Sequence, residues 1–341
     1  MIPRWALGVV AVGVVVAAVD VAVFAVAHDG TEPAAARTPA KSANLVAVID
    51  SKSGRIVDRL HVGDSPTLVV AGYGGAWILN KDDGTLTQID ASTRRIVETK
   101  PLDVTATDLA LGDGGVWVVG RMRSDITHPL EFSRLERIDP GTGRVDRRLQ
   151  TATGASVIAA GGDALWSTGA LPGRIRGAAR SDSHTGAMRR VNIEIYGDLI
   201  AADDRAAYWV GSAASRVARV STRTGLLTSS LPLATDESLA AGHVPPNPTD
   251  VAVGGGALWI SAVDGSVLRV DPKLHGIVAT IPACRNALAL SYGAGAVWVA
   301  CGDATVVRVD PQTDKPGPPI PVGGLPRGIA ASGGAVWVTL N

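Results

Sequence analysis

The 341-residue sequence predicts an all-β fold, a seven-bladed β-propeller closed by its N- and C-terminal strands and preceded by an N-terminal transmembrane helix. Three observations lead to this prediction. A tryptophan motif recurs along the chain, the last repeat is incomplete, and the first 27 residues are almost wholly apolar. We therefore expect a membrane anchor or signal peptide at 1–27, a flexible linker at 28–43 and the propeller at 44–341.

The N-terminal segment contains one apolar run, Trp5 to Ala27, in which Asp20 is the single charge. About 20 apolar residues span a bilayer as a helix, and the run exceeds the ~7–15 residues of an ordinary signal-peptide core. These features favour a retained single-pass anchor with the propeller outside the cytoplasm. The alternative is a secreted domain, because Ala25-Val26-Ala27 fits a signal-peptidase site that would be cleaved after Ala27.

The linker and the repeats follow in order. Residues 28–43 are rich in Pro, Ala and Thr and lack apolar periodicity, as expected of a flexible linker.

Beyond the linker, every tryptophan follows a short turn rich in small residues, at Trp77, Trp117, Trp166, Trp209, Trp259, Trp298 and Trp337. They lie 39 to 50 residues apart, close to the ~40–45 residues of a four-stranded propeller blade.

Each repeat has the same internal order. A small aliphatic stretch and a glycine turn precede the tryptophan strand, and a third strand ends in Arg-Val-Asp, as at Arg269 to Asp271. An Asp- and Gly-containing turn then leads to a fourth strand. Four such strands cannot bury both faces alone, so the units must stack radially. We expect the tryptophan to pack between blades and the third-strand arginine to contact a neighbouring blade.

The chain ends predict closure of the ring. The sequence stops at Asn341, directly after the seventh tryptophan strand, so this blade lacks its third and fourth strands. Residues 44–63 have the pattern of the missing pair, with Asp50 in the place of the third-strand aspartate. The N-terminal segment should therefore lie beside the C-terminal strand.

The repeat pattern P-x-x-(I/V)-A-x-G-x-G-A-V-W-V, followed by R-V-D-P-x-T-G, resembles that of YVTN-type propellers and of the virginiamycin B (streptogramin) lyase family. The resemblance covers nearly everything after the linker and implies the seven-bladed fold. Those lyases use magnesium-assisted proton abstraction with a histidine and a glutamate close in sequence. None of the six histidines here lies two residues from a glutamate, a departure that argues against lyase activity.

Composition and motifs favour a binding role. Lys plus Arg and Asp plus Glu both number 32, so no global field favours nucleic acid. Common catalytic and nucleotide-binding motifs are absent, and we expect no cofactor and no metal. The sequence thus favours a monomeric, non-catalytic ligand- or protein-binding module. A metal-assisted lyase or lactonase-like enzyme on the same propeller face stays the alternative.

The candidate binding residues lie in loops of one face. Insertions fall between the second and third strands of blades two and three and before blade five, and insertions confined to one face usually mark the binding face. They supply Arg121, Arg123, Arg174 and Arg176, with His128 and His243 at the rim. Arginine forks suit carboxylate, phosphate or sulfate. The expected partner is an acidic ligand, an anionic membrane surface or a juxtamembrane protein.

Two further groups of residues complete the predictions. Asp108, Asp198, Asp250 and Arg327 should lie around the mouth of the central channel. Cys284 precedes the first strand of blade six and Cys301 ends its second strand. Residue 287 should lie opposite Cys301, which leaves Cys284 about three residues from ideal register. An oxidising compartment would favour a disulfide between the two cysteines, and the alternative is two buried thiols.

Overall fold

The computed structural model describes residues 44–122, 133–151, 154–171, 174–193, 199–211, 215–234 and 246–341. The chain divides into two compact units, Met1–Ala40 and Lys41–Asn341, and the fold described below belongs to the second. The predicted membrane helix and linker, residues 1–43, lie outside the described residues. Within the described part of the chain, no helix has the length and apolar character needed to cross a membrane.

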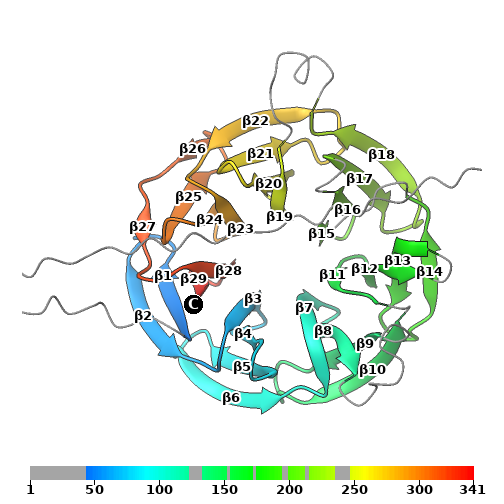
Figure 1. Ribbon diagram of the computed structural model, residues 1–341, viewed down its shortest axis with the longest axis horizontal. Coiled ribbons are helices and arrows are strands. Elements are labelled where there is room, and N and C mark those ends of the chain that lie inside the picture. Colours follow the sequence, from blue (N-terminus) through cyan, green and yellow to red (C-terminus); the bar gives the residue numbers. More distant parts are fainter. Residues whose placement is uncertain are drawn as a thin grey trace, which may run out of the picture. The chain divides into compact units, whose positions relative to one another are not determined.

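In the described part of the chain, seven antiparallel sheets are arranged in a ring (Figure 1). Blade 1 contains β3 (Pro66–Gly72), β4 (Gly75–Asn80), β5 (Thr85–Asp90) and β6 (Arg95–Pro101). Blade 2 contains β7 (Val104–Gly112), β8 (Gly115–Met122), β9 (Ser133–Ile138) and β10 (Val145–Thr151). Blade 3 contains β11 (Val157–Ala160), β12 (Ala164–Leu171), β13 (Arg174–Asp182) and β14 (Met188–Val191). Blade 4 contains β15 (Leu199–Ala202), β16 (Ala206–Gly211), β17 (Arg216–Ser221) and β18 (Leu227–Pro232).

The remaining blades complete the circle. Blade 5 contains β19 (Pro248–Gly254), β20 (Ala257–Ala262), β21 (Ser266–Val270) and β22 (Ile277–Pro282). Blade 6 contains β23 (Ala287–Gly293), β24 (Ala296–Cys301), β25 (Thr305–Asp310), β26 (Lys315–Pro316) and β27 (Ile320–Pro321). Its fourth strand is split into β26 and β27 because the intervening prolines cannot donate backbone hydrogen bonds. Blade 7 contains β28 (Pro326–Ser332), β29 (Ala335–Leu340), β1 (Leu45–Asp50) and β2 (Ile56–His61).

Ring closure is confirmed by the pairing of blade 7. Strand β1 lies antiparallel to β29, with Leu45 opposite Leu340 and Val48 opposite Trp337. Strand β2 then forms the outer edge of the same sheet. Two segments almost 300 residues apart in the sequence thus share one sheet, which holds the circle together.

The tryptophans occupy the inter-blade layers, and all seven are fully buried. In blades 2, 3, 5 and 6 the indole N–H donates to the carbonyl that ends the first strand, as Trp259 does to Gly254 at 3.1 Å. The opposite third-strand arginine covers the ring, with Arg269 5.7 Å from the Trp259 centroid. Arg269 also reaches Asp314 of blade 6 at 3.1 Å, so this arginine links neighbouring blades as predicted. Arg137 and Arg219 instead form their hydrogen bonds within their own blades.

Blade 4 departs from the predicted tryptophan position. Tyr208, not Trp209, lies opposite the third-strand arginine, Arg219. Trp209 is turned to the other face of its sheet, where its ring meets Trp166 edge-on at 5.7 Å. The sequence pattern predicts Trp209 at the repeat position, and this prediction is wrong by one residue in blade 4. Adjacent aromatic residues in one strand point to opposite faces, and only packing decides which one takes the repeat position.

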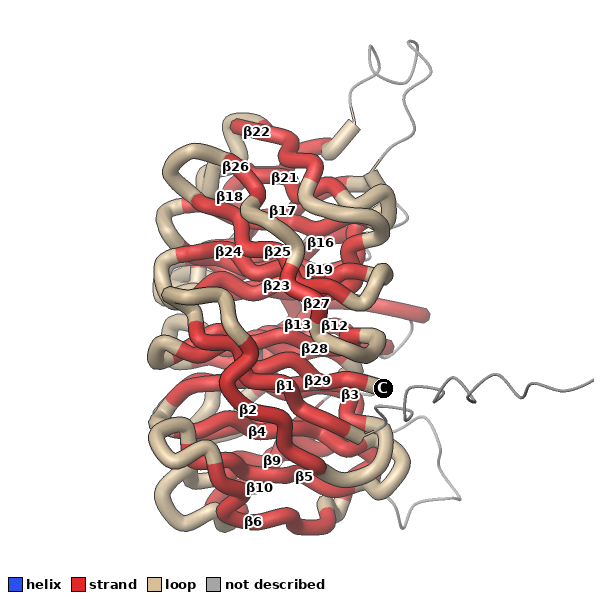
Figure 2. The backbone as a smooth tube through the Cα atoms, turned by 90° about the vertical axis from the view of Figure 1, so that its left-hand side faces the viewer, coloured by secondary structure: helices blue, strands red, loops and turns tan. Residues whose placement is uncertain are grey.

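The strands run between two faces of the ring (Figure 2). Glycine turns and Asp-containing turns lie on one face, and the loops joining second to third strands and successive blades lie on the other, the loop-bearing face. The C-terminus and Asn44 lie on the loop-bearing face. The predicted insertion of blade 3, 169–176, is mainly an extension of the β12–β13 hairpin, because Leu171 pairs with Arg174.

The cysteines of blade 6 lie together on the loop-bearing face. Ala287 is opposite Cys301, as predicted, and the structure pairs Cys284 with Cys301 as a disulfide with a Cα–Cα distance of 6.2 Å. A cross-link over a loop of this length contributes about 3 kcal/mol by restricting the unfolded chain. It ties the segment that enters blade 6 to the second strand of that blade.

We predict that the bond is present in protein purified without reductant. Alkylation followed by mass spectrometry should then label neither Cys284 nor Cys301, and should label both after reduction. Reduction should also lower the melting temperature by a few degrees. Full labelling of both thiols without reductant would show that the pair is not oxidised.

Candidate functional site

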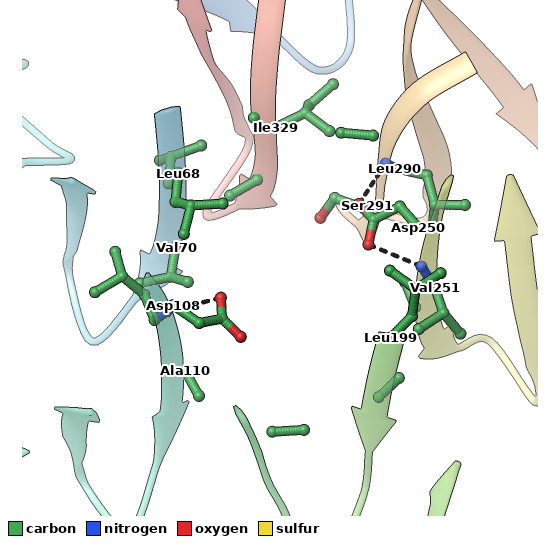
Figure 3. A pocket seen from close by; sticks show the side chains of 18 of the residues that line it. Leu68, Val70, Asp108, Ala110, Leu199, Asp250, Val251, Leu290, Ser291 and Ile329 are labelled. Carbon is green, nitrogen blue, oxygen red and sulfur yellow. Dashed lines mark hydrogen bonds between the residues drawn. The ribbon is translucent and has the colours of Figure 1, made fainter. Parts of the chain in front are cut away.

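The central channel is a cavity of about 590 Å³ lined by the first strand of every blade (Figure 3). Each first strand pairs only with the second strand of its own blade. Its other edge therefore presents backbone groups to the channel. Aliphatic side chains form most of the wall, and carboxylates enter it from opposite sides at Asp108 and Asp250.

Each carboxylate joins two neighbouring blades. Asp108 accepts hydrogen bonds from the backbone N–H of Leu109 in its own strand and of Ile158 in blade 3, both at 2.8 Å. Asp250 accepts the equivalent bonds from Val251 at 2.8 Å and Leu290 of blade 6 at 2.9 Å. Backbone N–H groups on the free strand edge thus find acceptors at two of the inter-blade junctions.

The two aspartates occupy the same position of the repeat, opposite the residue that lies two positions after the tryptophan of the second strand. The other blades carry apolar residues at this position: Leu68, Val157, Leu199, Ala289 and Gly328. Five blades therefore form their first strand without a carboxylate.

The channel disfavours ionisation of both acids. Burial first, and to a smaller extent the charge of Asp250, raise the pKa of Asp108 to about 7, against the opposing effect of its two backbone N–H donors. Burial likewise raises the pKa of Asp250 to about 6. Both side chains are half-buried in the channel wall, where the surrounding protein replaces part of the water that would stabilise the charged form.

The predicted ring of charges at the channel mouth is corrected in part. Asp198 lies outside the described residues. Arg327 lines the channel but lies one residue earlier in the repeat than the aspartates, and its side chain is exposed at the loop-bearing end. Among the described residues, no group of three or more His, Cys, Asp or Glu side chains is placed to hold a metal ion.

The predicted arginine site is only partly described. Arg123, His128 and His243 lie outside the described residues. The backbones of Arg174 and Arg176 belong to β13, at the loop-bearing end of blade 3. Arg121 belongs to β8 at the same end of neighbouring blade 2, and its side chain is exposed.

Arg121 belongs to a row of polar residues that the sequence analysis missed. The strand register places Thr105, Arg121, Ser133 and Thr151 opposite one another across all four strands of blade 2. Opposite residues share one face of a sheet, and here it is the face toward blade 3, because Val119 and Leu135 two residues away pack there. We call these four residues the polar row.

Two hydroxyls of the polar row have no hydrogen-bond partner in the described part of the chain. Ser133 is 1% exposed and Thr151 is 4% exposed, yet neither hydroxyl is bonded within the described structure. A buried hydroxyl without a partner costs about 1–3 kcal/mol. Only the strand register brings these residues beside Arg121, since they lie 12 and 30 positions after it in the chain.

Comparison with known proteins supports the fold. No family model matches the chain, and no curated protein matches it. Among solved structures, it is similar to a streptogramin B lyase, with a TM-score of 0.62 and 15% identity over 88% of this chain and 96% of that one. It is also similar to the Myceliophteria thermophila Cps50 (Swd1) β-propeller domain, with a TM-score of 0.62 and 10% identity over 84% and 99% of the two chains.

A third similar structure is apo AztD from Citrobacter koseri, with a TM-score of 0.61 and 10% identity over 88% of this chain and 97% of that one. At these identities the likeness concerns the fold alone. Together with the seven sheets and their closure, it shows that this chain is a seven-bladed β-propeller of the kind that the resemblance to the virginiamycin B lyase-like propellers predicts.

Proposed function

We propose that this protein is an exported, membrane-anchored, non-catalytic propeller that binds an acidic group on its loop-bearing face, between blades 2 and 3. The observation that carries the proposal is the polar row, where exposed Arg121 lies opposite Ser133 and Thr151 follows on the next strand. Both hydroxyls are buried and have no hydrogen-bond partner among the described residues. A guanidinium and nearby hydroxyls supply the donors that phosphate, sulfate or carboxylate oxygens accept. Arg174 and Arg176 on the neighbouring hairpin would add positive charge.

The path of the chain supports a membrane-facing orientation. Asn44 lies on the loop-bearing face, where its side chain bonds Asp64 and Ser65. A flexible linker of 16 residues has a root-mean-square span of roughly 22 Å, so an anchor at 1–27 would hold this face near anionic headgroups or a juxtamembrane protein. The acids of blade 1 on the same face, Asp82 and Asp83, would restrict the contact to blades 2 and 3.

Binding of the propeller, residues 41–341, to anionic vesicles tests the proposal. We expect binding to phosphatidylglycerol-containing vesicles, weakened by 0.5 M salt, and none to pure phosphatidylcholine. Charge reversal of Arg121, Arg123, Arg174 and Arg176 to Glu should abolish it without changing the melting temperature. Ser133→Ala should weaken binding several-fold and leave stability unchanged or raised, because it removes a hydroxyl that has no partner among the described residues.

Arg216→Glu is the matched control. Arg216 is an exposed arginine at the loop-bearing end of blade 4, away from the polar row. Arg216→Glu changes the net charge by the same amount as the single variant Arg121→Glu. We expect Arg216→Glu to reduce vesicle binding far less than Arg121→Glu does. Equal losses in the two variants would mean that binding follows net charge and would contradict a site between blades 2 and 3.

A further inference from the structure

The channel holds two carboxylates that the acidic-ligand proposal does not use. Asp108 and Asp250 project into the cavity from blades 2 and 5, on opposite sides of the ring (Figure 3). Leu68 and Leu199 occupy the same repeat position in blades 1 and 4. Because those blades fold with leucine there, the aspartates are not required to build the first strand.

Retaining two acids in this place is unfavourable without a partner of opposite charge. An ionised carboxylate loses hydration inside a narrow aliphatic channel, and two backbone N–H groups replace only part of it. The two acids also repel each other, since the charge of Asp250 disfavours ionisation of Asp108. A cation placed between them would relieve both costs.

The rest of the channel restricts what kind of cation fits. Its volume of about 590 Å³ lies in the usual range for small-molecule sites, roughly 300–1,000 Å³. Ca²⁺ takes about 6–8 oxygen ligands, whereas the charged oxygens of the described lining come from two separate aspartates. Aliphatic walls around two well-separated carboxylates match an alkyl chain that carries ammonium or guanidinium groups.

We propose that the central channel binds a small organic cation, an alkylammonium or alkylguanidinium compound, through the carboxylates of Asp108 and Asp250. The backbone N–H groups of Leu109, Ile158, Val251 and Leu290 orient the carboxylates. The remaining carboxylate lone pairs accept hydrogen bonds from the ligand. This site is independent of the polar row and binds the opposite charge.

Isothermal titration of the full chain in detergent with 1,4-diaminobutane tests the site, with 1,4-butanediol as the neutral probe of the same length. We expect saturable binding of the diamine and none of the diol. Asp108→Leu and Asp250→Leu should each weaken binding at least tenfold, and the double variant should abolish it. Both substitutions copy residues that blades 1 and 4 already carry at this position, so the variants should fold, with melting temperatures at or above the parent value.

Two further measurements complete the test, a control substitution of an acidic residue outside the channel and the pH dependence of diamine binding. Asp303→Asn removes an exposed acid on the loop-bearing side of blade 6 and should leave diamine affinity unchanged. Binding should be at least tenfold weaker at pH 5 than at pH 8, because both carboxylates are mostly protonated at pH 5. Tyr292 and Arg327 are the other titratable groups of the described lining.

Three outcomes would overturn the proposal. Equal heats from the diamine and the diol would mean that charge is not recognised. Undiminished binding by the double leucine variant would place the diamine elsewhere on the protein. Displacement of the diamine by equimolar Ca²⁺ or Mg²⁺ would identify the pair as part of a metal site instead.

Discussion

Deletion of residues 44–62 should abolish cooperative folding of the propeller. The deletion removes β1 and β2 and leaves β29 with an unpaired edge. Val46, Ala47, Val48 and Ile49 are all completely buried and belong to the layers on both sides of blade 7. Burial of each valine or isoleucine contributes about 1.5–3 kcal/mol, which is large against a total of about 5–15 kcal/mol for a typical protein.

Size-exclusion chromatography and differential scanning calorimetry measure this effect. We expect aggregates or no cooperative transition for the deletion variant, because an exposed strand edge pairs with other chains. Deletion of residues 1–40 is the control and should give a soluble domain with one sharp transition, since it leaves every described strand in place. Similar melting of the two variants would show that β1 and β2 are not needed to hold the ring.

Trp259→Ala should lower the free energy of unfolding by about 3–5 kcal/mol. The side chain is completely buried between blades 5 and 6. Its loss also removes the bond to the Gly254 carbonyl and the ring beneath Arg269. Denaturant titration followed by circular dichroism measures the change, and a loss below about 1 kcal/mol would contradict an inter-blade packing role.

Two conservative variants separate the indole hydrogen bond from ring packing. Trp259→Phe loses the bond to Gly254, whereas Trp77→Phe removes a buried indole N–H that has no partner within the described structure. Both substitutions remove the same side-chain volume, and both tryptophan rings are completely buried. We expect Trp259→Phe to cost about 1 kcal/mol more than Trp77→Phe, and equal costs would mean that the bond contributes nothing.

The repeat made most of the fold predictable. Strand order, blade boundaries and closure by residues 44–63 follow from a pattern that recurs with regular spacing, and the pairing of β1 with β29 confirms the closure. Blade 4 is the exception, where the repeat pattern did not identify which aromatic residue takes the repeat position. Tyr208 and Trp209 are adjacent aromatic residues, and the pattern assigned the repeat position to Trp209. The packing of Trp209 against Trp166 places Tyr208 there instead.

The candidate sites were predictable only as single residues. The sequence points to Arg121 by its place in an insertion and to Asp108 and Asp250 by their place at the start of a first strand. Ser133 and Thr151 carry no such signal, because each is an ordinary residue at a strand end. Their relation to Arg121 exists only through the register of three paired strands.

The sequence by itself determined the number of blades, the segment that closes the ring and the face that carries the long loops, because these depend on local turn chemistry and on the period of the pattern. Tertiary structure alone decided that Asp108 and Asp250 face each other across one channel and that each accepts an N–H from the following blade. These contacts join residues 40 or 50 positions apart. Their geometry depends on how far each blade is rotated about the axis, which no local pattern encodes.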